Sequence, residues 1–142
     1  MKTSKILIAG FVGGIVALLL GFLIYGLALE SFFAENVGSA TGVMKEEGDF
    51  SWPAMVLGHI AYGMLFAVVY GRWASITTFA TGAKAGAVLG FLVGSAVNLI
   101  YYGSSNIMNL TSALADIVVM TVTGAIVGGV VAIVLDRLKK QK

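Results

Sequence analysis

The sequence predicts an all-α membrane protein in which a single domain, residues 1–142, crosses the bilayer with four helices. The chain is 58% hydrophobic and only 11% charged, whereas about a quarter of the residues in soluble domains are charged. Its mean hydropathy is +0.96. The charged residues border long apolar stretches, and about 20 apolar residues suffice for one membrane-spanning helix.

The uncharged stretches set the expected helices at residues 6–29, 52–71, 85–102 and 111–135, with an outer loop at 30–51. The stretch from 85 to 115 is too long for one span. Its polar cluster from Gly103 to Asn106, followed by Asn109, predicts the turn between the last two helices. The first apolar run is too long for the core of a signal peptide, so we expect a retained helix.

The basic residues predict the orientation. Eight of the nine flank the spans on one side: Lys2, Lys5, Arg72, Lys84, Arg137, Lys139, Lys140 and Lys142. The outer loop carries five of the seven acidic residues and only one basic residue, Lys45. Because the positive side of membrane proteins is cytoplasmic, we expect both termini there. The charges lie at helix ends rather than on one face, so the lipid bilayer, and no nucleic acid, is the expected partner.

The composition also limits the chemistry. The chain has no cysteine and one histidine, which argues against disulfides and against a zinc site made by protein ligands alone. It contains no motif that sets a nucleophile beside a base, no phosphate-binding loop and no metal-ligand spacing. We therefore expect a protein without enzymatic activity, metal or cofactor.

An internal duplication is suggested by aligning the first helix with the third at an offset of 76. Positions 9 to 25 then give seven identities in seventeen, including the openings Ala9-Gly10 and Ala85-Gly86. The second and fourth helices match more weakly, with His59 opposite Asp116. The alignment predicts two tandem helical hairpins related by an axis along the membrane normal.

Three short patterns resemble a known family. They are Gly21-x-x-x-Tyr25-Gly26 closing the first helix, Phe32-Phe33 beyond it, and Gly86-x-x-x-Gly90 opening the third helix. The chain resembles the domain of unknown function 1761 family, which consists of small bacterial membrane proteins with four helices. The resemblance implies the topology and a bacterial inner-membrane location. It implies no activity and no site residues.

Rows of small residues predict where helices pack. Residues four apart share a helix face, and small side chains let membrane helices approach closely. The third helix carries Gly82, Gly86, Gly90 and Gly94, and the first carries Gly10, Gly14 and Gly21. Asn98 continues the row of the third helix, so we expect it in a helix–helix interface.

The second helix carries an aromatic stripe, defined here as Trp52, Met55, His59, Tyr62, Phe66, Tyr70 and Trp73. Packing in the bundle or at a subunit interface is the favoured interpretation of the stripe, and a ligand groove is the alternative. The opposite face, which includes Leu65, is expected to face lipid.

The candidate polar site consists of His59, Asp116, Asn98 and Tyr62. Asp116 is the only acid within a span, and an intramembrane carboxylate is a functional hypothesis by default. It lies near the outer end of its helix, so a structural or solvated role is equally open. The duplication suggests that His59 and Asp116 lie at similar depth, where they could touch.

Two classes of function remain. We favour a non-enzymatic membrane protein that acts by helix packing, as a homo-oligomer or as an accessory subunit of a larger complex. The alternative is a transporter or channel for a small solute, proton or ion. Four helices are too few to enclose a path, so it would work as an oligomer. A second alternative is haem or pigment binding through His59.

Overall fold

The computed structural model describes residues 1–140 and confirms the predicted fold class. Four helical segments are long and apolar enough to cross a bilayer. They are α1 (Thr3–Leu23) continued by η1 (Ile24–Ala28), α3 (Trp52–Val68) continued by η3 (Val69–Ala74), α4 (Phe79–Ser104) and α5 (Leu110–Lys140). Helices suit the hydrocarbon interior of a bilayer because they satisfy their backbone hydrogen bonds internally.

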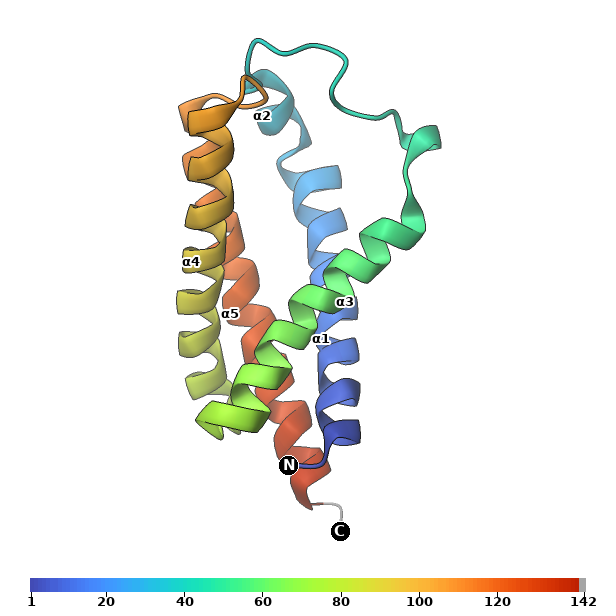
Figure 1. Ribbon diagram of the computed structural model, residues 1–142, viewed down its shortest axis with the longest axis vertical. Helices are drawn as coiled ribbons and strands as arrows, with labels where there is room; N and C mark the ends of the chain where they lie inside the picture. Colours follow the sequence, from blue (N-terminus) through green and yellow to red (C-terminus); the bar gives the residue numbers. More distant parts are fainter. Residues whose placement is uncertain (141–142) are drawn as a thin grey trace.

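The helices form two antiparallel pairs, α1 with α3 and α4 with α5 (Figure 1). The pairs meet through α5, which contacts both α1 and α3, whereas the extensive contacts of α4 are with α5. The N-terminus and the end of α5 lie at the same end of the bundle, called the terminal end below, and the connection from α1 to α3 covers the other, called the loop end.

Local signals fix the helix starts. Pro53 occupies the first turn of α3, where its missing N–H costs no hydrogen bond. The Thr78 side chain accepts a hydrogen bond from the Thr81 N–H at 3.2 Å, so α4 begins at Phe79 rather than near the expected residue 85. Lys84 therefore lies inside α4, where its long side chain can extend toward the terminal end. Asn109 caps α5 by accepting from the Ser112 N–H at 2.8 Å.

The glycine row of α4 packs directly on the backbone of α5. A Cβ atom built on Gly86 would lie 2.1 Å from the Gly124 carbonyl oxygen, and one on Gly90 would lie 2.2 Å from that of Met120. Gly82 makes the same approach to Gly128. These distances leave no room for any side chain, so the row forms an interface within the chain.

The first pair crosses through glycines as well. A Cβ on Gly63 of α3 would lie 2.1 Å from the backbone nitrogen of Gly14, and one on Gly14 would lie 2.5 Å from the Cα of Ile60. Gly10 faces the side chain of Met64. Gly21 differs, because its neighbour is the imidazole of His59 and not a helix backbone. The two helices therefore separate toward the loop end, where the His59 side chain lies between them.

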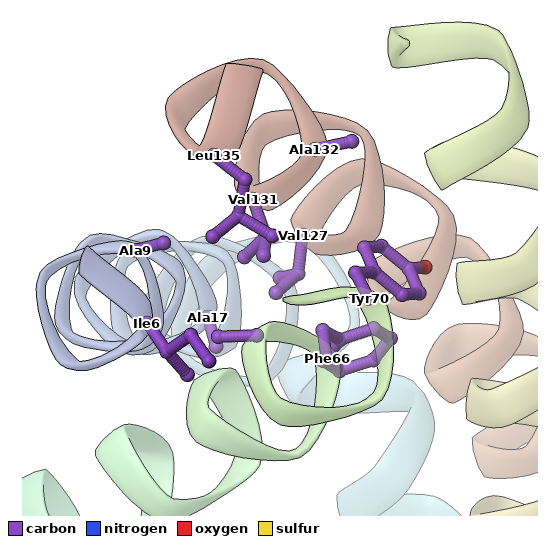
Figure 2. Packing of buried hydrophobic residues seen from close by; sticks show 10 residues of the cluster. Ile6, Ala9, Ala17, Phe66, Tyr70, Val127, Val131, Ala132 and Leu135 are labelled. Atoms are coloured by element: carbon purple, nitrogen blue, oxygen red, sulfur yellow. The ribbon is translucent and has the colours of Figure 1, made fainter. Parts of the chain in front are cut away.

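The hydrophobic core lies in the half of the bundle at the terminal end. It is built by α1, α3 with η3, and α5, from Ile6, Ala9, Ala17, Phe66, Ala67, Tyr70, Val127, Val131, Ala132 and Leu135 (Figure 2). Phe66 and Tyr70 pack edge to face at 6.1 Å, and the Tyr70 hydroxyl donates to the Gly82 carbonyl at 2.7 Å. Leu65 is partly buried against this core, so the expectation that it faces lipid is wrong.

The connection at the loop end includes α2 (Glu30–Glu35) and η2 (Glu47–Asp49). Its backbone pairs with the turn between α4 and α5: the Gly38 N–H donates to the Ile107 carbonyl and the Ala40 N–H to the Asn106 carbonyl, both at 3.0 Å. A Cβ on Gly38 would lie 2.0 Å from the Asn106 carbonyl oxygen. This pairing ties the two helix pairs together at the loop end.

Candidate functional site

The polar residues of the spans meet around Asp116 on α5. The Tyr25 hydroxyl donates to one carboxylate oxygen, and the Asn98 side-chain amide donates to the other at 2.6 Å. The same amide nitrogen donates to the Gly94 carbonyl at 3.0 Å. Both oxygens of the carboxylate are thus hydrogen-bonded, as a carboxylate in an apolar environment requires.

The three partners come from three helices, which explains the position of each. Asn98 follows Gly94 on the face of α4 that touches α5, and it is 2% exposed. Tyr25 lies in η1, a π-helical turn at the end of α1, a type of turn that is frequent at functional sites. The Asp116 network, defined as Tyr25, Asn98 and Asp116, therefore joins the first helix pair to the second.

A membrane cavity of about 340 Å³ lies next to this network, between α1, α3 and α5. Its walls carry no Lys, Arg, Asp or Glu side chain. It is lined by Ala17, Gly21, Tyr25, Ala54, Met55, Gly58, His59, Tyr62, Met120 and Thr123.

His59 is held in one orientation in this cavity. Its Nδ1 lies 2.7 Å from the Met55 carbonyl oxygen. A carbonyl only accepts hydrogen bonds, so Nδ1 carries a proton and donates. The other nitrogen, Nε2, faces α1 at Gly21, where an added Cβ would lie 3.0 Å away. In the neutral imidazole Nε2 is therefore a hydrogen-bond acceptor.

Tyr62 lies about one turn from His59 along α3, toward the terminal end. Its ring packs edge to face on Phe66 at 5.0 Å. Its hydroxyl is the only buried side-chain nitrogen or oxygen without a hydrogen bond within residues 1–140. The aromatic stripe is thus divided: Phe66 and Tyr70 belong to the core, and Met55, His59 and Tyr62 line the cavity.

A second cavity, of about 470 Å³, lies under the connection at the loop end. It is lined by Tyr25, Glu30, Phe33, Ala34, Val37, Met44, Asn98, Ile107, Met108, Ser112 and Asp116. Tyr25 lines both cavities, and its hydrogen bond to Asp116 lies at their boundary.

The contact that the sequence left open between His59 and Asp116 does not form: within residues 1–140 no hydrogen bond or ion pair joins them. His59 faces Gly21, whereas Asp116 meets the same helical segment at Tyr25, about one turn closer to the loop end. The two side chains therefore contact this helical segment about one turn apart. Asn98 is the predicted site residue that reaches Asp116.

Sequence reasoning missed Tyr25 as a site residue, because the sequence shows it only in the pattern that closes the first helix. Its partner, Asp116, becomes apparent only from the packing of α1 against α5. No group of three or more His, Cys, Asp or Glu side chains gathers within residues 1–140 in a way that could hold a metal ion.

No protein-family model, no curated protein and no solved structure matches this chain. The resemblance to the domain of unknown function 1761 family stays a prediction.

Proposed function

We propose that this chain is a non-enzymatic component of a bacterial inner membrane, and that it acts by helix packing as a homo-oligomer or as an accessory subunit of a larger complex. The observation that carries the proposal is the position of α4. This helix packs extensively on α5 alone, and the opposite side of α4 presents large apolar side chains.

That side, called the outer α4 face, consists of Val88, Leu92 and Leu99, each about half exposed. At 100° per residue, positions 88, 92 and 99 fall within about 40° of one another and so share one face. This face lies on the side of α4 opposite the glycine row. The glycine rows are fully used within the chain. Any contact with a second copy or a partner subunit therefore uses bulkier faces, of which this one is the most peripheral.

The absence of cysteine from the sequence makes cross-linking a clean test. We expect Leu92→Cys and Leu99→Cys to form disulfide-linked dimers in native membranes when copper phenanthroline is added as the oxidant. The matched controls Leu19→Cys on α1 and Leu57→Cys on α3, which are exposed to a similar degree, should stay monomeric. A partner subunit would instead appear as a co-purifying protein in mild detergent. A monomer without any partner would contradict the proposal.

The proposed orientation places both termini in the cytoplasm. It is supported by the basic side chains at the terminal end, where Arg72 donates to the Thr3 hydroxyl at 2.6 Å and Lys5 to the Leu138 carbonyl at 2.5 Å. A reporter fused to the C-terminus should be active only if it is one that functions in the cytoplasm. Activity of a periplasmic reporter at that site would reverse the orientation.

A transporter working as an oligomer is the second candidate, and the two cavities favour it. They adjoin at the hydrogen bond between Tyr25 and Asp116, so a solute or proton could reach the middle of the bundle from the loop end. The core closes the terminal end within one chain, which is why a path would need a second copy. Proton or ion flux in proteoliposomes that Asp116→Asn abolishes would favour transport.

Haem or pigment binding stays a prediction that one spectrum can test. The hydrogen bond from Nδ1 of His59 to Met55 leaves Nε2 as the nitrogen that would bind an iron. Purified protein without visible absorption would remove this alternative.

A further inference from the structure

The membrane cavity opens toward lipid through α3. Three of its lining residues, Ala54, Met55 and Gly58, are exposed at the helix surface. Gly58 is especially open, because a Cβ atom built there would meet nothing within 4 Å. All three lie in a segment long and apolar enough to span the bilayer. An occupant would therefore enter from the membrane.

The cavity offers one oriented hydrogen-bond acceptor. Nε2 of His59 has no hydrogen bond within residues 1–140, and the Tyr62 hydroxyl is the only buried unpaired atom there. Nε2 is therefore accessible. The hydrogen bond from Nδ1 to Met55 fixes the ring, and in the neutral imidazole it makes the opposite nitrogen the acceptor.

The rest of the lining selects against charge. No Lys, Arg, Asp or Glu side chain lines the cavity, so an ionised ligand would find no ammonium, guanidinium or carboxylate partner there. The walls are formed mainly by Ala, Gly, Met and Tyr residues, which favour a ligand with an apolar body. A volume of about 340 Å³ falls within the range of small-molecule sites.

We propose that this cavity binds an uncharged, membrane-dissolved phenol or alcohol, whose hydroxyl donates to Nε2 of His59 while its apolar body lies between α1, α3 and α5. This binding site is independent of the packing function proposed above. A bound hydroxyl would sit beside the hydrogen bond between Tyr25 and Asp116, since Tyr25 lines the same cavity.

The test uses two probes of nearly equal shape, 4-hexylphenol and its methyl ether, 4-hexylanisole, which lacks the donor. The protein has one histidine, so ¹⁵N-histidine labelling gives a single imidazole to observe by NMR in lipid nanodiscs. The phenol should shift the Nε2 resonance saturably, and bind about threefold to tenfold more tightly than the ether.

Two variants separate the cavity from general partitioning into lipid. Gly58→Leu places a side chain at the mouth, where nothing opposes it, and should abolish the saturable shift. Ala61→Leu, on an exposed part of α3 outside the cavity, should leave it unchanged. The proposal is overturned if the phenol gives no saturable shift, if the ether binds equally well, or if Gly58→Leu binds like the unmodified protein. Because the ligand comparison uses the unmodified protein, the test stands even if a variant fails to fold.

Discussion

The two halves of this bundle differ in how their helices pack against one another. At the terminal end, α1, α3 and α5 are close-packed around Phe66 and Tyr70. Toward the loop end, α3 leaves α1, and the space holds two cavities and the Asp116 network. The same chain thus combines a half stabilised by van der Waals contact with a half stabilised by a few polar contacts. The polar groups that could recognise a ligand are confined to the second.

The largest expected effect comes from breaking a backbone contact between α4 and α5. Gly90→Leu should destabilise the protein by at least about 3 kcal/mol, or prevent folding, because the new side chain would collide with the Met120 carbonyl. Ala61→Leu adds bulk at an exposed position of α3 and should change stability by less than about 0.5 kcal/mol. Thermal unfolding in detergent measures both. Equal stability of the two variants would contradict the direct packing of the glycine row.

A second pair of variants compares the two halves directly. Phe66→Ala removes a fully buried ring from the core and should cost about 3–5 kcal/mol. Met55→Ala removes a side chain from the wall of an existing cavity and should cost less than about 1 kcal/mol. The same unfolding measurement applies, and similar losses for both would mean that the cavity is packed shut in the membrane.

The Asp116 network should behave as one unit. Tyr25→Phe or Asp116→Asn should each cost about 1.5–3 kcal/mol, since each weakens a hydrogen bond to a charged group. The double variant should show a coupling of at least about 0.5 kcal/mol. The pair His59→Phe and Asp116→Asn should be closer to additive, because no hydrogen bond joins these residues. Stronger coupling for the second pair would show that the two side chains meet after all.

The smallest expected effect is a gain. The hydroxyl of Tyr62 is buried without a hydrogen bond, so Tyr62→Phe removes an unsatisfied group and should stabilise the protein by up to about 1 kcal/mol. The ring contact with Phe66 would remain. A loss of stability in the same unfolding assay would indicate that the hydroxyl has a partner, such as a bound water or ligand.

The sequence predicted the four helices, because apolar length within one segment defines a span. Four-residue spacing sets the α4 glycines and Asn98 on one face of the helix, and in the structure that face lies against α5. The faces of α3 were harder: Leu65 packs on the core, although the aromatic side of the helix was expected to be the buried one.

The residues that hydrogen-bond to Asp116 could not be derived from the sequence, because they depend on how the two helix pairs pack against each other. The alignment that set His59 opposite Asp116 assumed that both helices had the same register in their hairpins. In the structure Gly14 packs against Ile60 but Gly90 packs against Met120, a register that differs from the alignment by about one turn. Tyr25 therefore takes the place beside Asp116 that the alignment gave to His59.

The most direct test of the contrast between the halves is labelling of single cysteines in intact cells with a small, membrane-impermeant thiosulfonate. Met108→Cys places the thiol in the wall of the cavity under the loop-end connection, at a partly exposed position, and Ala132→Cys places it in the core. We predict that the first variant reacts from outside the cell and that the second does not react. Labelling of Ala132→Cys together with protection of Met108→Cys would contradict both the accessible cavity at the loop end and the closed terminal end.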